Sequence, residues 1–143
     1  MSDDKTKYKN DADRIYYEWD LALSNNDVEG LLRLYAPDAI LESPLVPHLL
    51  GIEHGICNGE TELRRFFEIL ALRKPTIRKY YRTDYFTDGK RIIWEYPRLS
   101  PAGEQMDFVE VMDLKESLIY YHRVYWGWRG IKVMKDNEYH RLS

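Results

Sequence analysis

The stretch ALSNNDVEGLLRLYAPDA, residues 22–39, contains the transitions that decide the fold. Residues 24–26 (Ser-Asn-Asn) are turn formers and should end a preceding helix. Asp27 can cap a second, short helix. The inner side of that helix would carry Val28, Leu31, Leu32 and Tyr35. Pro37-Asp38 should stop it, after which residues 39–43 have the composition of a first strand.

The segments on either side of this stretch extend the pattern. Upstream, Asn10 or Asp11 can cap a helix that runs to about Ser24, and residues 1–9 are expected to form a flexible arm. One buried face of that helix would carry Ile15, Trp19, Ala22 and Leu23. Downstream, residues 44–59 hold prolines and glycines and predict a long loop at a pocket rim.

A third helix and a set of strands complete the predicted domain. Residues 59–62 open this helix and Pro75 closes it. Its apolar stripe is Leu63, Phe66, Phe67 and Leu70. Strands are expected at residues 77–87, 90–99, 105–114 and 118–128, the first two joined by the hairpin signal Asp88-Gly89. Helices followed by hairpins indicate one α+β domain over residues 10–135 with a meander-type antiparallel sheet, and a tail at 136–143.

The overall composition argues against several classes of function. Lys and Arg number 21 against 24 Asp and Glu, a net charge of −3, so a nucleic-acid partner is not expected. The apolar runs are far shorter than the ~18 residues of a membrane helix, so no membrane partner is expected either. Cys57 is the single cysteine, which precludes an internal disulfide and agrees with a cytoplasmic location. Aromatic residues make up 14% of the chain, so some of them could line a cavity.

Several of these segments together resemble the nuclear transport factor 2-like superfamily. Residues 22–39 are similar to its AL..GD...L..L.A.DA signature, and Glu42-Ser43-Pro44 follows where relatives carry a carboxylate–proline element. Two later matches are Gly59-xxx-Leu63-Arg64-xx-Phe67 and His122-Arg123-Val124-Tyr125-Trp126-Gly127. Over residues 12–130 the chain looks most like the SnoaL-like group, which includes polyketide cyclases and is similar to ketosteroid isomerases.

The resemblance implies a cone in which N-terminal helices and a curved antiparallel sheet enclose a pocket for a small molecule. Any chemistry is expected to need no cofactor, since the sequence has no phosphate-binding loop or dinucleotide fingerprint. The superfamily mixes enzymes with pure binding modules, so two functions stay open. One is an isomerase, cyclase or hydrolase acting on an apolar, polyketide- or steroid-like ring system. The other is a non-catalytic ligand-binding or dimerisation module.

Glu110 is the first candidate catalytic residue. Strand alternation puts it on one face with Met106, Phe108 and Met112, and the resemblance turns that face toward the pocket. Its position is that of an oxyanion-hole acid in the isomerases. A carboxyl among Phe and Met is desolvated, so its pKa should rise and it could act as a general acid or base near neutral pH. The alternative is a structural acid bonded to a tyrosine or histidine.

His122 is the candidate partner of Glu110. It lies on the next predicted strand with Val124 and Trp126 on the same face. A turn at residues 115–117 would bring it toward Glu110 across the sheet, close enough for the carboxylate to fix an imidazole tautomer. The alternative is a core histidine whose hydrogen bonds are satisfied.

The position that carries the proton-shuttling carboxylate in the isomerases is not an acid in this chain. In those relatives the proton-shuttling acid immediately precedes the proline at the end of the first strand. Here Ser43 occupies that position, with Glu42 one residue earlier. Because side chains alternate along a strand, Glu42 would point away from the pocket unless a bulge intervenes. Both residues are candidate substrate contacts, and a solvent-facing acid is the alternative for Glu42.

The remaining site candidates shape the pocket. Tyr16, roughly one helical turn before Trp19, could donate a phenol hydrogen bond to a developing oxyanion, and Trp19 could shape the cavity. The other proposed lining residues are Phe108, Trp126 and either Trp94 or Tyr96, with His48 and His54 at the rim.

Two further expectations concern metals and partners. His48, His54 and Cys57 lack the spacing of a zinc site, so no metal is expected. The partners expected are a small-molecule ligand and a second copy of the chain, giving a homodimer through the outer sheet face. The apolar residues predicted on that face are Ile93, Pro97, Val109, Val111 and Tyr125.

Overall fold

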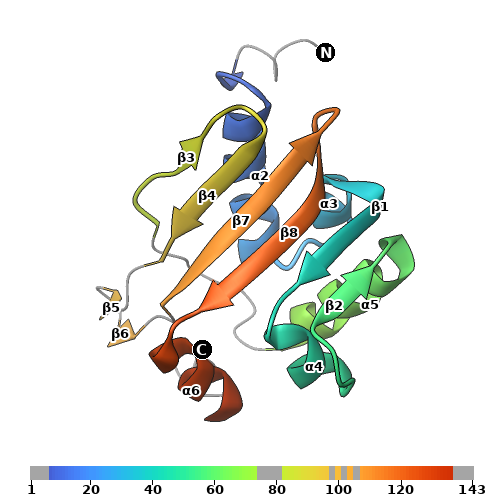
Figure 1. The fold of residues 1–143 in the computed structure, drawn as a ribbon, viewed down its shortest axis with the longest axis vertical. Coiled ribbons are helices and arrows are strands. Elements are labelled where there is room, and N and C mark those ends of the chain that lie inside the picture. Colours follow the sequence, from blue (N-terminus) through green and yellow to red (C-terminus); the bar gives the residue numbers. More distant parts are fainter. Residues whose placement is uncertain (1–6, 74–81, 97–98, 101–102, 105–106, 137–143) are drawn as a thin grey trace.

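The computed structural model describes residues 7–73, 82–96, 99–100, 103–104 and 107–136 (Figure 1). The helices are α2 (Asp11–Ser24), α3 (Val28–Leu32), α4 (Leu45–Leu50), α5 (Glu60–Ala71) and α6 (Trp128–Asp136). The strands are β1 (Tyr35–Glu42), β2 (Ile56–Asn58), β3 (Phe86–Thr87), β4 (Arg91–Glu95), β5 (Leu99–Ser100), β6 (Gly103–Glu104), β7 (Phe108–Lys115) and β8 (Leu118–Trp126). Within the described residues, no helix has the length and apolar character needed to cross a lipid bilayer.

Six of the strands form one curved, open sheet in the order β2-β1-β8-β7-β4-β3, and β5 pairs with β6 apart from it. In Figure 1, α2, α3 and α5 lie behind the sheet and cover one of its faces, while the face toward the viewer carries none of the described helices. The predicted α+β class is confirmed. The expected antiparallel meander is confirmed for β3, β4, β7 and β8, whereas the first strand, β1, joins it parallel to β8. A parallel neighbour needs a long crossover, and here that crossover contains α5 and the strands β3, β4 and β7.

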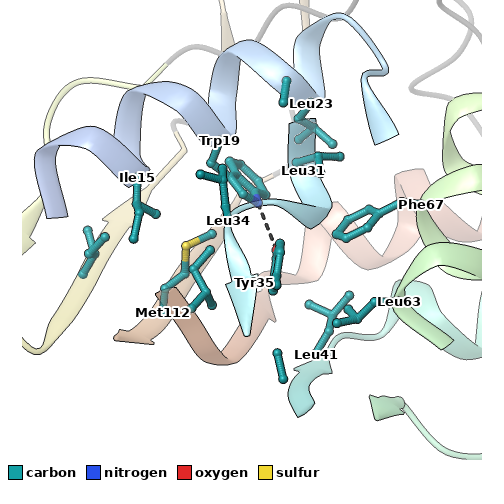
Figure 2. Close-up of a cluster of buried hydrophobic side chains, with 14 of the residues drawn as sticks. Ile15, Trp19, Leu23, Leu31, Leu34, Tyr35, Leu41, Leu63, Phe67 and Met112 are labelled. Atoms are coloured by element: carbon teal, nitrogen blue, oxygen red, sulfur yellow. Dashed lines mark hydrogen bonds between the residues drawn. The ribbon is translucent and has the colours of Figure 1, made fainter. Parts of the chain in front are cut away.

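The core lies between the sheet and the helices that cover it (Figure 2). Asn10 caps α2, because its side chain accepts a hydrogen bond from the backbone N–H of Asp13 at 2.8 Å. The predicted inner face of this helix is confirmed by the burial of Ile15, Trp19, Ala22 and Leu23. The apolar stripe of α5 is buried as well, at Leu63, Phe66, Phe67 and Leu70. Burial of these side chains in one cluster is the main stabilising contribution to the fold.

The second helix is shorter than its sequence pattern suggests. α3 ends at Leu32, Arg33 is its C-terminal cap, and Tyr35 is already the first residue of β1. The prediction that Tyr35 lies on the inner side of this helix is therefore wrong. Pro37 contributes to this difference, since a proline disfavours the helical region for the residue immediately before it, here Ala36. The pairing of β1 with β8 shifts register around this proline, between Tyr35 and Ile40.

The segment predicted as a long loop, residues 44–59, contains regular structure, so that prediction is wrong. α4 occupies its first part and ends at Gly51, whose φ of 69° is the left-handed conformation that favours glycine. β2 then pairs antiparallel with β1, where Cys57 lies opposite Leu41. A six-residue helix and a three-residue strand are too short to leave a clear periodic pattern in the sequence.

The predicted hairpin signals are confirmed. Asp88-Gly89 joins β3 to β4, with Gly89 at a φ of 93°. The turn from β7 to β8 is at Glu116-Ser117, where both residues have positive φ. The last strand, predicted to run to residue 128, ends at Trp126, and Trp128 is already the first residue of α6. Parts of the strands expected at 77–87, 90–99 and 105–114 lie outside the described residues.

Candidate functional site

A cavity lies between the helix-covered face of the sheet and the helices α2 and α5. Its polar lining residues are Ser43, Glu110 and His122. The apolar lining residues are Trp19, Leu23, Leu41, Leu45, Phe66, Phe67, Leu70, Phe108, Val124 and Trp126. The cavity offers about 60 Å³ to the centre of a water-sized sphere, which is room for a few waters or a small flat fragment.

Glu110 on β7 and His122 on β8 point into this cavity and contact each other. His122 Nε2 lies 2.6 Å from Glu110 Oε1, and the two residues are 2% and 4% exposed, respectively. The strand register explains the contact. His122 is directly opposite Met112, and Glu110 is opposite Val124, so the acid and the imidazole meet diagonally across the hairpin. A carboxyl and an imidazole at this distance can share or transfer a proton.

Tyr35 contacts the second ring nitrogen of His122, Nδ1. Its Oη lies 2.8 Å from His122 Nδ1 and accepts a hydrogen bond from Trp19 Nε1 at 3.0 Å, the contact drawn in Figure 2. Burial raises the pKa of Tyr35 well above its ordinary value, so the phenol stays protonated. Tyr35 was not predicted as a partner of His122, because its spacing from Leu31 and Leu32 suggested a helix. Pro37 is the residue in the sequence that favours extended backbone nearby.

Trp94 and Tyr96 are both buried and lie on the same face, because side chains alternate along β4 and just beyond it. Tyr96 donates a hydrogen bond to Glu110 Oε2 at 3.4 Å. Trp94 is directly opposite Glu110 in the β4–β7 pairing but packs edge-on against Trp19 and is not part of the cavity lining. Both residues face inward and neither lines the cavity, but Tyr96 contacts the candidate acid.

One wall of the cavity is formed by two stacked aromatic rings. The rings of Phe108 and Trp126 stack with their centres 5.2 Å apart and their planes inclined by 16°. Trp126 Nε1 is buried and has no hydrogen-bond partner in the described part of the chain. Ser43 adds a buried hydroxyl, whose oxygen accepts a hydrogen bond from the backbone N–H of Leu45 at 3.1 Å. This part of the site offers a ligand a stacking surface and two hydrogen-bond donors.

Comparison with solved structures identifies the architecture. An NTF2-like protein of unknown function from Burkholderia pseudomallei aligns with a TM-score of 0.67 over 88% of this chain and 96% of that chain, at 16% identity. This is the nuclear transport factor 2-like fold. No protein-family model and no curated protein sequence matches the chain, so the likeness rests on structure.

Two other chains with the nuclear transport factor 2-like fold are similar to this one. A SnoaL-like protein of unknown function from Burkholderia thailandensis aligns with a TM-score of 0.67 over 82% of this chain and 95% of that chain, at 15% identity. The epoxide hydrolase/cyclase-like enzyme SalBIII, described for pyran ring formation in the polyether salinomycin, aligns with a TM-score of 0.59 at 19% identity. That alignment covers 91% of this chain and 97% of SalBIII.

Within this nuclear transport factor 2-like pocket, Tyr16 does not take the place expected for a phenol donor. Its ring lies under the Arg82 guanidinium at 3.7 Å and against Trp94, and it does not line the cavity. Burial raises the pKa of Tyr16, and the nearby Arg82 charge offsets part of that effect. The phenol that contacts His122 comes from Tyr35 on β1 instead of from α2.

Glu42 lies outside the nuclear transport factor 2-like pocket. It is exposed and accepts a hydrogen bond from the Tyr121 hydroxyl at 2.7 Å, on the uncovered face of the sheet. The register shift in β1 lies earlier, between Tyr35 and Ile40, so alternation sends Ser43 inward and Glu42 outward. The acid that lines this cavity is therefore Glu110 on β7, and Glu42 at the end of β1 is not part of the lining.

The predicted rim histidines lie away from the lining of the nuclear transport factor 2-like pocket. His48 on α4 and His54 before β2 are both exposed. Cys57 is fully buried on β2, and burial raises the pKa of its thiol to about 11, so it packs in the core as a thiol and is not a nucleophile. Across the described ranges, no three His, Cys, Asp or Glu side chains are grouped so as to hold a metal ion.

Proposed function

We propose that this chain binds an apolar, ring-containing small molecule in the cavity and performs acid–base chemistry on it without a cofactor. Glu110 is the general acid or base, and His122 is its hydrogen-bond partner. The observation that carries the proposal is the 2.6 Å contact between a carboxyl and an imidazole in a cavity whose other walls are mostly apolar. Electrostatic and hydrogen-bonding interactions are stronger in such a site than in water.

One carboxyl that takes and returns a proton can serve isomerisation, cyclisation or hydrolysis of a polyketide- or steroid-like substrate. The likeness to SalBIII, an epoxide hydrolase/cyclase-like enzyme, supports this class of reaction. A substrate oxygen that develops negative charge would find the Ser43 hydroxyl and the Trp126 indole N–H as donors. The site thus combines one proton acceptor with donors for an oxyanion.

The size of the cavity limits which part of a ligand it holds. About 60 Å³ is well below the ~300–1,000 Å³ of typical ligand pockets. The partly exposed members of the lining are Leu45, Val124 and Trp126, so we expect a ligand to enter beside them. One ring would stack on the Phe108–Trp126 wall, and the remainder of a larger molecule would extend toward solvent.

The hydrogen bonds to Glu110 also fit a second candidate function, a non-catalytic ligand-binding module. In that case Glu110 is a buried structural acid held by His122 and Tyr96, and the cavity binds its ligand unchanged. Both functions require a ligand, so conversion of that ligand distinguishes them.

The uncovered face of the sheet supports the proposal that the chain forms a homodimer. Ile93 and Tyr125 are 37% and 56% exposed there, and Val109, opposite Tyr125, is half-buried. Val111 is already buried within the chain, and Pro97 lies outside the described residues. A second copy would cover the exposed apolar side chains. Light scattering at micromolar concentration should give twice the mass of one chain, and a clean monomer would contradict the dimer.

The proposed function is tested by a thermal-shift screen of aromatic and polyketide-like ketones, followed by product analysis for every ligand found. We expect at least one ligand that the protein converts and that Glu110→Gln still binds but converts roughly 100-fold or more slowly. Asp113→Asn is the matched control, because it alters an acid of the same strand on the opposite face. A ligand that all three proteins bind and none converts would establish the binding module instead.

A further inference from the structure

Five buried polar side chains from separate parts of the chain form one continuous series of hydrogen bonds, which we call the relay. Its order is Trp19 on α2, Tyr35 on β1, His122 on β8, Glu110 on β7 and Tyr96 after β4. The successive distances are 3.0, 2.8, 2.6 and 3.4 Å. Because all five residues are buried, water does not compete strongly for these groups.

The relay has a direction because one of its ends can only donate. An indole N–H has no acceptor capacity, so Trp19 Nε1 donates to Tyr35 Oη. The Tyr35 hydroxyl keeps one proton to donate, and its remaining partner among the described residues is His122 Nδ1. Nδ1 therefore accepts, and the single proton of the neutral imidazole is on Nε2.

The same contacts fix the orientation of the imidazole ring. A 180° flip would place carbon atoms where the two ring nitrogens now meet Tyr35 and Glu110, and both hydrogen bonds would be lost. With its proton on Nε2, His122 donates to Glu110 Oε1. The other carboxylate oxygen, Oε2, has the longer contact to Tyr96 and is the less firmly held of the two.

We propose that Tyr35, oriented by Trp19, is a positioning residue that holds His122 in the Nε2–H tautomer and thereby makes Glu110 Oε2 the proton-carrying atom of the site. This inference rests on the proposed function and specifies which atom of Glu110 acts on the ligand. Oε2 takes a proton from the ligand, the electron pair of the broken bond stays on the ligand, and the same oxygen then returns the proton, so no co-reactant is consumed. His122 donates to Oε1 throughout.

The opposite tautomer is unfavourable in this network. A proton on Nδ1 would point at Tyr35 Oη, which already accepts from Trp19, and the Tyr35 hydroxyl would then have no acceptor among the described residues. A buried hydroxyl without an acceptor is destabilising. Removal of the Tyr35 hydroxyl should therefore release the tautomer while leaving the contact between His122 and Glu110 in place.

The tautomer is measured without any ligand, from the imidazole ¹⁵N resonances of the labelled protein at neutral pH. The His122 signals are identified by their loss in His122→Gln. In the parent protein we expect an unprotonated Nδ1 and a protonated Nε2. Tyr35→Phe should give a mixture of tautomers, and Trp19→Phe a smaller change in the same direction. Tyr121→Phe removes a phenol at the neighbouring position of β8, outside the relay, and should leave the pattern unchanged.

A protonated Nδ1 in the parent protein would overturn the inference, and so would an unchanged pattern in Tyr35→Phe that circular dichroism shows to be folded. If Tyr35→Phe does not fold, the parent spectrum and Trp19→Phe decide the question. Failure of the inference and failure of the proposed function are distinguishable. A ligand that is converted by a protein with the Nδ1–H tautomer contradicts the inference alone, whereas an Nε2–H tautomer with no converted ligand contradicts the proposed function alone.

Discussion

The two faces of the β7–β8 hairpin carry acids in different environments. On the inner face, the Glu110 and His122 side chains are 5% and 3% exposed and form a hydrogen-bonded pair in a mostly apolar cavity. On the outer face, Asp113 forms ion pairs with both Arg91 and Arg123, the latter at 3.0 Å. The strands and their register are the same, and alternation along the strand alone decides which environment each acid meets.

The difference shows that burial alone does not decide whether an acid is structural or reactive. It also matters whether a nearby cation neutralises the charge of the acid. Burial works to raise the pKa of Asp113, but hydrogen bonds from Arg123 and Arg91 outweigh it and hold that pKa below its usual range. Asp113 is therefore a stable anion over the physiological range. The hydrogen bonds to Glu110 come from His122 and Tyr96 and include no lysine or arginine, so no permanent cation fixes its charge within the described part of the chain.

The largest effect should come from breaking the inner pair. His122→Leu leaves the Glu110 carboxylate buried without its short hydrogen bond, so the free energy of unfolding at pH 7 should fall by about 3 kcal/mol or more. Adding Glu110→Leu removes the unsatisfied acid and should restore most of the loss. Urea unfolding of the parent, the single and the double variant measures both steps. A double variant as unstable as His122→Leu would show that packing, not the buried acid, explains the loss.

The outer acid should matter less, and in a pH-dependent way. Asp113→Asn should lower the free energy of unfolding by about 1–2 kcal/mol at pH 7, mostly through Arg123, because Arg91 is half exposed. Since the folded-state pKa is depressed, this contribution is present above the unfolded value of ~3.9 and is lost as pH falls through the folded value. In denaturant unfolding, the difference between the parent and Asp113→Asn should therefore begin to shrink below about pH 4 and vanish only below the folded-state pKa. An equal difference at pH 7 and pH 2.5 would contradict this account of the cluster.

Trp126→Phe should separate ligand binding from stability. The indole N–H of Trp126 has no partner in the described part of the chain, so its removal should change the free energy of unfolding by less than about 1 kcal/mol. The affinity for a carbonyl-bearing ligand should fall roughly 5- to 10-fold if that N–H donates to the ligand. Calorimetric titration with a ligand from the screen measures the change, and an unaltered affinity would remove Trp126 from the donor set.

The smallest effect is expected for Tyr121→Phe on the outer face. Its hydroxyl donates to the exposed Glu42, and such surface contacts change the free energy of unfolding by less than about 0.5 kcal/mol. Thermal unfolding at several protein concentrations provides the measurement. A loss above about 1 kcal/mol that varies with protein concentration would show that this face is covered by a second copy.

The sequence was a good guide wherever the signal was local. The inner stripe of α2, the Asp88-Gly89 hairpin and the grouping of side chains on the two faces of β7 all follow from spacing along a few residues. The parallel pairing of β1 with β8 could not be read in the same way, because tertiary packing decides which distant strands become neighbours.

The candidate site shows the same limit. Alternation grouped Glu110 with Phe108 and Met112, and the family resemblance turned that face inward, but the 2.6 Å contact with His122 depends on the register of the hairpin. Tyr35 was predicted to lie on the second helix, so Tyr16 was the phenol considered for the site. Because α3 ends at Leu32, Tyr35 lies on β1 instead and contacts His122. The catalytic roles of Glu110 and His122 remain predictions.

The neighbouring positions of β1 and β8 determine when the site can form during synthesis on the ribosome. Tyr35 and His122 are 87 residues apart. At about 5–20 residues per second, His122 is therefore synthesised roughly 4–17 s after Tyr35. Throughout that interval one edge of β1 has no partner strand and the aromatic side of α2 has no complete sheet to cover it. The nascent chain therefore passes through an aggregation-prone stage at which chaperones would act, and the pocket is among the last features of the molecule to appear.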